Sequence, residues 1–213
     1  RGLNTSQPNL SLHPVRVLGF GEISAVLALD TLPEAKDWVF KRLPVFVSKS
    51  EAAAHIELTA RYVDIITRRI GIDVKDTKYS SVRPRDDFVV FYAAQQMLPA
   101  DHIGSAMLRW APDADCIALF EAVLNQVEKV WEFNRTNSDV LEIAIDLQLS
   151  NWAIVSDEPR PRIDAHTPLT FIDITTPLMR SGGRELLNTE AFIRGCPALL
   201  RWPGRTLMAG DVV

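Results

Sequence analysis

One long helix pattern, set between two groups of strand patterns, constrains the fold of this chain more than any other feature. It opens with a capping box, in which Ser48 is followed three residues later by Glu51. The helix is expected to run from about 49 to 70, with Gly71 as its C-terminal stop. Short apolar segments typical of strands lie at 15–18, 25–29, 38–41, 77–82 and 87–94. The first hundred residues are therefore predicted to form three strands, one helix and two strands.

The second half of the chain is predicted to contain one further long helix and two short strands. The helix pattern covers 112–134 and carries an apolar stripe expected to face the core, made of Ile117, Phe120, Val123, Leu124, Val127 and Val130. An apolar segment at 140–145 follows, and then short strands at 152–155 and 169–172. The last forty residues are expected to form one short helix near 185–193 and irregular chain. Four tryptophans are interpreted as packing residues, namely Trp110, Trp131, Trp152 and Trp202.

Charge and cysteine usage narrow the range of partners. The net charge is −4, so no basic field favours nucleic acid, and no apolar run of about 18 residues predicts a membrane span. Cys116 and Cys196 have neither a metal-binding nor a disulfide spacing, which favours a reducing cytoplasm. The chain begins with Arg1 rather than methionine, which we interpret as a fragment or a trimmed form.

A glycine-rich turn joins the first two predicted strands and reads Gly19-Phe-Gly21-Glu-Ile-Ser24-Ala-Val26. Glycine has no side chain to hold the backbone N–H groups away from a phosphate, yet two glycines in a hairpin are more often only a turn. Lys41, on the third predicted strand, also has two interpretations. A strand lysine is more often a solvated edge residue than a ligand contact.

Polar residues stand at the ends of the short apolar segments in the second half. Asp146 follows 140–145, Asn151 precedes 152–155, and Asp173 follows 169–172. A burial-prone carboxylate at the end of a strand needs a partner, which is often a metal or a role as a base. The alternative is that each residue only closes a turn or caps a strand.

In this order, these pieces resemble the protein-kinase-like superfamily over residues 15–175. The resemblance rests on a G-x-G-x-x-G-x-V loop with serine in place of the third glycine, a V-A-I-K-like strand, a D-x-x-x-x-N catalytic loop and a later metal-binding aspartate. The matching positions are Gly19, Gly21, Ser24, Val26, Lys41, Asp146, Asn151 and Asp173.

The resemblance implies an α+β, two-lobed protein-kinase-like fold. The N-lobe, 1–97, would hold a five-stranded antiparallel sheet and one helix. The partial C-lobe, 98–213, would be mainly helical and apparently truncated, because only 40 residues follow Asp173. ATP would lie in the cleft between the lobes, with its adenine against a hinge near 93–97.

The resemblance also implies the role of each matched residue. The glycine-rich loop and Lys41 would position the ATP phosphates. Asp146 would orient or deprotonate an acceptor hydroxyl. Asn151 and Asp173 would bind Mg²⁺, which takes hard oxygen ligands and keeps several waters.

A helix carboxylate would hold Lys41 in place, and two candidates compete for this role. Glu51 already occupies the third position of the capping box, so Glu57 is favoured as the ion-pair partner. The alternative for Glu57 is an exposed i,i+4 pair with Arg61.

Departures from the kinase pattern point away from a regulated protein kinase. Ala144 stands where the catalytic loop usually has histidine, Gln148 stands where serine/threonine kinases have lysine, and Ile174 and Thr175 follow Asp173. No A-P-E segment follows. These changes favour a phosphotransferase for small hydroxyl acceptors, similar to aminoglycoside or choline kinases, or a kinase-like family without an assigned substrate. The alternative is a nucleotide-binding pseudokinase that serves as a scaffold.

Overall fold

The computed structural model describes residues 10–21, 24–83 and 88–195. The described residues divide into two compact units. The first comprises the described residues within 10–57, 76–97 and 188–195, and the second comprises 58–75 and 98–187. No helix in these ranges is long and apolar enough to cross a membrane.

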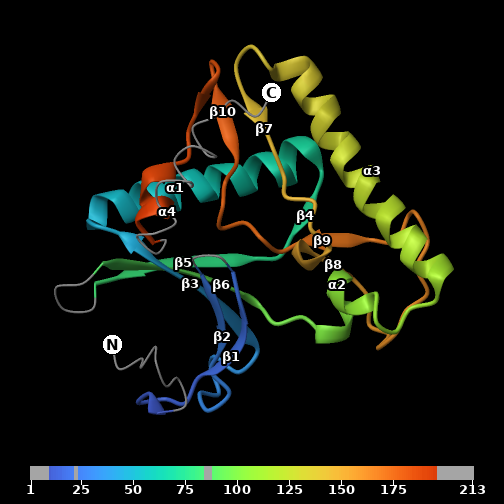
Figure 1. Cartoon of the computed structure of the whole chain (residues 1–213), viewed down its shortest axis with the longest axis horizontal. Coiled ribbons are helices and arrows are strands. Elements are labelled where there is room, and N and C mark those ends of the chain that lie inside the picture. Colours follow the sequence, from blue (N-terminus) through green and yellow to red (C-terminus); the bar gives the residue numbers. More distant parts are fainter. Residues whose placement is uncertain (1–9, 22–23, 84–87, 196–213) are drawn as a thin grey trace. The chain divides into compact units, whose positions relative to one another are not determined.

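The first unit contains a five-stranded antiparallel sheet (Figure 1). Its strands follow the spatial order β1-β2-β3-β6-β5, and every neighbouring pair is antiparallel. The strands are β1 (Arg16–Phe20), β2 (Ala25–Ala28), β3 (Trp38–Phe46), β5 (Thr77–Val82) and β6 (Val89–Gln96). The predicted five-stranded antiparallel sheet is confirmed, as is the α+β class.

Strand β3 is longer than the sequence pattern predicts, because it continues beyond Lys41 to Phe46. Its pairing with β6 shifts register between Leu43 and Phe46, on either side of Pro44. Proline cannot donate a ladder hydrogen bond, so inside a sheet it is tolerated at such an irregularity.

Helix α1 (Lys49–Ile65) continues as one π-helical turn, Ile66–Ile70, and ends at Gly71. Gly71 adopts a φ of 81°, which favours glycine, and Ile72 N–H closes the end on the Ile66 carbonyl at 2.8 Å. At the other end, Glu51 N–H donates to Ser48 Oγ at 3.1 Å. The predicted start and stop of this helix are therefore confirmed.

An aromatic cluster fills the core of the first unit between α1, the sheet and helix α4 (Thr189–Gly195). The buried His55 ring of α1 lies 4.9 Å from Phe46, 5.1 Å from Phe91 and 5.7 Å from Phe192, measured between ring centroids. Because these four rings come from separate elements, they hold α4 in place in this unit.

The second unit combines helix α3 with two small three-stranded sheets. The sheets have the orders β4-β9-β8 and β11-β10-β7. The helices are the 3-10 turn Ala100–His102, α2 (Gly104–Met107), α3 (Asp113–Asn137) and the 3-10 turn Leu149–Asn151. The strands are β4 (Asp73–Val74), β7 (Glu142–Ile143), β8 (Trp152–Ile154), β9 (Leu169–Phe171), β10 (Met179–Ser181) and β11 (Arg184–Glu185).

Helix α3 buries a different face from the one predicted. Three stripe residues, Ile117, Phe120 and Leu124, are exposed, whereas Val123, Val127 and Val130 are buried as expected. The buried face also takes in Leu119, Ala122 and Phe133. The helix has apolar residues on two faces, so periodicity alone did not identify the face that packs.

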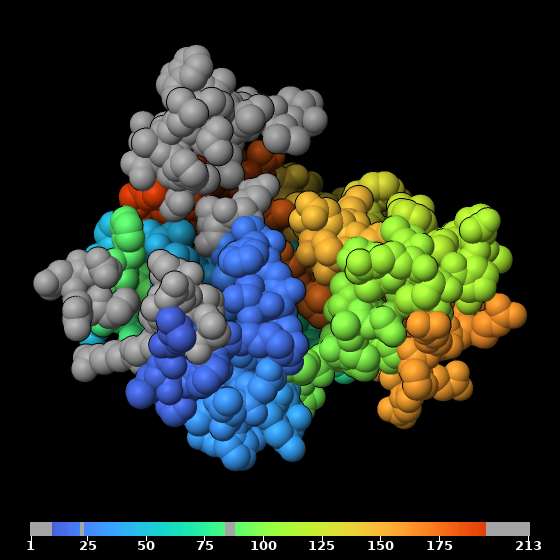
Figure 2. Space-filling view, turned by 60° about the horizontal axis from the view of Figure 1, so that its bottom comes forward, coloured from blue at the N-terminus to red at the C-terminus, as the bar shows by residue number. Residues whose placement is uncertain are grey.

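The surface of the second unit includes the segment that joins β8 to β9, drawn orange beside the green helices in Figure 2. Arg162 pairs with the buried Asp115 of α3 at 3.4 Å, and Asn125 Nδ2 donates to the Ala165 carbonyl at 2.9 Å. These contacts fix the long proline-containing connection along α3.

The end of the described chain differs from the prediction of irregular structure with a helix near 185–193. Strands β10 and β11 form a hairpin whose turn is Gly182-Gly183, with φ angles of 55° and 74°. Two successive left-handed residues are typical of the tight hairpin turns that favour glycine. The helix α4 begins only at Thr189.

Candidate functional site

Asn151 and Asp173 lie at the same end of the β8–β9 pair. The register places Trp152 opposite Phe171, so the residue before β8 meets the residues after β9. The Ile172 N–H donates to the Asn151 carbonyl at 2.9 Å and continues this pairing by one residue. Antiparallel pairing therefore brings together two predicted site residues that are 22 positions apart.

Asp146 lies in the loop between β7 and the 3-10 turn Leu149–Asn151. Its Oδ1 accepts the Gln148 N–H at 3.0 Å, which shapes the loop locally. Two residues earlier, Ala144 N–H donates to the Leu178 carbonyl at 2.9 Å, and the Ala144 carbonyl accepts the Tyr62 hydroxyl at 2.9 Å. The entry to this loop is thus held from two directions.

The charges of Asp146 and Asp173 both act on the hydroxyl of Tyr62, in the second unit. Burial raises the pKa of Tyr62, and the charges of Asp173 and Asp146 raise it further. Asp146 also lies five residues before Asn151, in the loop that leads into the 3-10 turn carrying Asn151. Asp146, Asn151 and Asp173 form what we call the loop cluster.

Asn151 is the most buried member of the loop cluster, with 8% of its surface exposed. Its side-chain Nδ2 is buried without a hydrogen-bond partner among the described residues. A buried amide left unpaired costs about 1–3 kcal/mol. A half-turn of the amide would present Oδ1 at the same place, where a cation could take the oxygen as a ligand.

Asp173 is partly buried, and its Oδ1 accepts hydrogen bonds from Thr175 through Oγ1 at 3.1 Å and N–H at 3.4 Å. Among the described residues, no three His, Cys, Asp or Glu side chains are grouped to hold a metal. A metal at the loop cluster would therefore rely on one carboxylate, one amide oxygen and waters. That ligand set suits Mg²⁺, which commonly binds through one or two carboxylates and keeps several waters.

Three of the residues predicted in the first half lie in one row across the sheet of the first unit. Gly19 pairs with Val26, and Val26 pairs with Lys41. Residues directly opposite each other in a sheet share a face. Lys41 is partly buried and is paired on its other side with Ala93. We call Gly19, Val26 and Lys41 the sheet row.

The turn next to the sheet row leaves room for a side chain at Gly19 but not at Gly21. Gly21 N–H donates to the Ser24 carbonyl at 2.9 Å, and a Cβ at Gly21 would lie 2.6 Å from Ser24 Oγ. A Cβ at Gly19 would have no described atom within 4 Å. Residues 22 and 23 of the motif lie outside the described residues.

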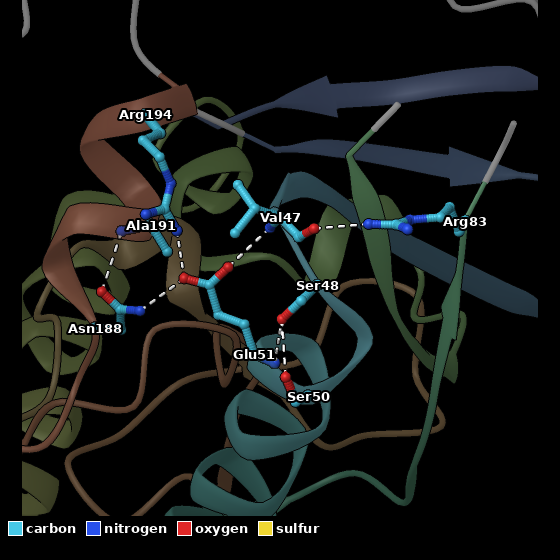
Figure 3. A network of polar contacts seen from close by, with 8 residues as sticks. All are labelled: Val47, Ser48, Ser50, Glu51, Arg83, Asn188, Ala191 and Arg194. Carbon is cyan, nitrogen blue, oxygen red and sulfur yellow. Dashed lines mark hydrogen bonds and ion pairs between the residues drawn. The ribbon is translucent and has the colours of Figure 1, made fainter. Parts of the chain in front are cut away.

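The two helix carboxylates have different surroundings. Glu57 is exposed on α1. Glu51 Oε2 accepts Val47 N–H at 2.8 Å, and Oε1 accepts Asn188 Nδ2 at 2.8 Å and pairs with Arg194 (Figure 3). Burial would raise the pKa of Glu51, but the Val47 hydrogen bond and the Arg194 ion pair outweigh it and lower the pKa.

The Glu51 contacts predict a pH-dependent stability. The pKa of Glu51 is lower in the folded chain than in the unfolded chain, where glutamate titrates near about 4.3. Its contribution is therefore present above that pH and is lost as the pH falls through the folded pKa. Glu51→Gln should lower the urea midpoint at about pH 7, and the gap from wild type should shrink towards about pH 3.

Glu57→Gln is the matched control for this pH series, since Glu57 is an exposed glutamate of the same helix. Its unfolding free energy should stay within about 0.5 kcal/mol of wild type. An equal gap between Glu51→Gln and wild type at both ends of the pH range would contradict a role for the ionised carboxylate.

Sequence reasoning missed three residues around these positions: Tyr62, Thr175 and Arg194. Thr175 bonds to Asp173 only two positions away, whereas Tyr62 and Arg194 make contacts that no local pattern identifies. The Tyr62 contact spans 82 positions and the Arg194 contact spans 143.

The chain is thus an α+β protein with a sheet row in one unit and a polar loop cluster in the other. The model of a family of unknown function, DUF6206, matches residues 10–206, and the chain belongs to this family. No curated protein matches it.

Among solved structures, the chain is similar to a 2.2 Å crystal structure of WbdD, with 12% sequence identity and a TM-score of 0.42. The match covers 84% of this chain and 36% of the WbdD chain. Similarity at this level does not establish a shared fold. The two-lobed kinase-like arrangement and its domain boundaries therefore stay predictions.

Proposed function

We propose that this protein is an ATP- and Mg²⁺-dependent phosphotransferase that acts on the hydroxyl group of a small molecule. The observation that carries the proposal is the loop cluster, in which Asn151 and Asp173 adjoin at one strand end and Asp146 lies in the loop that leads into the 3-10 turn carrying Asn151. The orphaned amide of Asn151 adds a buried polar group that a ligand would satisfy.

Asp146 would orient the acceptor hydroxyl and take its proton as the oxygen attacks the γ-phosphorus. The bond from that phosphorus to the β,γ-bridging oxygen breaks, and ADP leaves. Asn151 and Asp173 would hold Mg²⁺, which neutralises charge on the phosphates. Such a reaction depends mainly on positioning and charge stabilisation.

The residues of the sheet row would contact the nucleotide. Lys41 would supply a cation to the phosphates, and Gly19 would allow the backbone to approach them. Gly21 and Ser24 would shape the turn, and Val26 would present an apolar side chain beside Lys41.

Calorimetric titration of the whole chain with ATP, with and without Mg²⁺, tests the binding part of this proposal. Turnover is then measured with water, simple alcohols, choline and aminoglycosides as acceptors. Mg²⁺-dependent binding with turnover is expected. Mg²⁺-dependent binding without turnover over this panel would favour the scaffold alternative, and no ATP binding would overturn both.

Asp173→Asn should weaken Mg²⁺-dependent ATP binding by at least about tenfold, since even indirect changes at metal sites typically cost 10–100-fold. Asparagine keeps an oxygen to accept the Thr175 hydrogen bonds, so the local fold should persist. The matched control is Asp139→Asn, at an exposed position just after α3. Equal ATP affinity in all three proteins would remove Asp173 from the metal site.

A further inference from the structure

A tyrosine that no sequence motif marked contacts the backbone that leads into the Asp146 loop. Tyr62 belongs to α1 and exposes 1% of its surface. Its hydroxyl donates to the Ala144 carbonyl at 2.9 Å, two residues before Asp146. A buried hydroxyl needs a partner, and this one finds it on the backbone that leads into the Asp146 loop.

The backbone of residue 144 is held on both sides. The Ala144 N–H is bonded to the Leu178 carbonyl, which lies after Asp173, and the Ala144 carbonyl is bonded to Tyr62. One residue earlier, Asn134 of α3 exchanges two hydrogen bonds with Ile143, at 2.7 and 2.9 Å. The chain that enters the Asp146 loop is therefore clamped by α1, by α3 and by the segment that follows Asp173.

The charges of the loop cluster act on the Tyr62 hydroxyl. Burial and the charges of Asp173 and Asp146 all raise the pKa of Tyr62, so its hydroxyl stays protonated. A neutral hydroxyl remains a donor at every physiological pH and adds no negative charge beside a phosphate. Alanine at 144 offers no polar side chain, so the backbone carbonyl is the group that Tyr62 can hold.

We propose that Tyr62 is a positioning residue that fixes Asp146 by anchoring the Ala144 carbonyl from α1. This inference rests on the proposed phosphotransferase function, because positioning matters only where Asp146 acts on an acceptor. Tyr62 itself need not touch the substrate.

The first experiment uses Tyr62→Phe and needs no substrate. Phenylalanine keeps the buried ring and removes only the hydroxyl. Hydrogen exchange of the Ala144 and Gln148 amides, followed by NMR, should become at least about fivefold faster, since the loop loses its anchor. Unchanged exchange at both amides would show that the hydroxyl does not hold the loop and would overturn the inference.

The second experiment separates positioning from a general structural role. Using ATP turnover with the best acceptor of the panel, Tyr62→Phe should lower kcat by about tenfold and leave the affinity for Mg²⁺·ADP within about threefold. In the Asp146→Asn background, the same change should have no further effect on kcat, because its action passes through Asp146. An independent loss in that background, or an unchanged kcat, would overturn the inference.

The outcomes also separate this inference from the proposed function. If the wild-type chain turns over ATP but Tyr62→Phe does so equally well, only the role of Tyr62 fails. If the wild-type chain does not turn over ATP with any acceptor of the panel, the catalytic proposal fails and the role of Tyr62 fails with it.

Discussion

Replacing Asp146 with asparagine is expected to reduce phosphoryl transfer by about 10³-fold or more, in the upper part of the range for loss of a general base. Asparagine has the same shape and keeps an oxygen that can accept the Gln148 N–H, so the loop should retain its geometry. It has no negative charge and cannot take the proton of the acceptor. Mg²⁺-dependent ATP binding should therefore stay within about threefold of wild type, as measured by calorimetry beside the turnover assay.

Asp164→Asn provides a matched control for this variant. Asp164 also accepts the N–H of the residue two positions later, that of His166, at 2.8 Å, and it is exposed in the same unit. This control loses one carboxylate from a similar turn and should keep full activity. Full activity in Asp146→Asn would remove Asp146 from its proposed role, and equal losses in both variants would point to net charge instead.

Trp152→Ala is expected to lower the free energy of unfolding by about 3–5 kcal/mol, as is typical of a large aromatic deleted from a core. Trp152 exposes 0% of its surface and lies on β8 with its ring 5.1 Å from that of Phe171. It directly follows Asn151, so the cavity left by alanine would also loosen the strand end that carries the loop cluster. Urea denaturation measures the loss, and ATP titration below the midpoint tests the link to binding.

The tryptophans provide their own control, because the packing prediction was confirmed for Trp152 and was wrong for Trp131. Trp131 lies on α3 with 66% of its surface exposed, and Trp131→Ala should change stability by no more than about 0.5 kcal/mol. Trp202 lies outside the described residues. Similar losses in the two variants would contradict the burial seen for Trp152.

Local patterns predicted helix α1 and the sheet of the first unit well. Ser48 and Glu51 marked the start of α1, and Gly71 marked its end, because caps are formed by residues close in sequence. The strand over 77–82 appears as predicted. Pro44 shows the limit of such patterns, since β3 passes through it by shifting register with a distant strand.

Local sequence patterns likewise predicted one part of the candidate site, and long-range contacts decided the rest. The apolar runs before Asp146 and Asp173 identified both carboxylates from sequence. The adjacency of Asn151 to the residues after β9 needed the pairing of two strands separated by a long connection. Glu51 was assigned to the cap by its spacing, but its ion pair with Arg194 comes from the far end of the described chain.

What the sequence by itself determined is the order and type of the two long helices and of strands β1, β2, β3, β5, β6, β8 and β9, together with the chemical nature of the polar residues at their ends, since both depend on neighbours within a few positions. Only the tertiary structure decided which face of α3 is buried, how the Gly182-Gly183 hairpin forms beside β7, and that Tyr62 reaches Ala144. These outcomes depend on contacts between residues that are far apart in the sequence and meet only in the folded chain. Packing selects among the possible contacts, and local patterns do not reveal the choice.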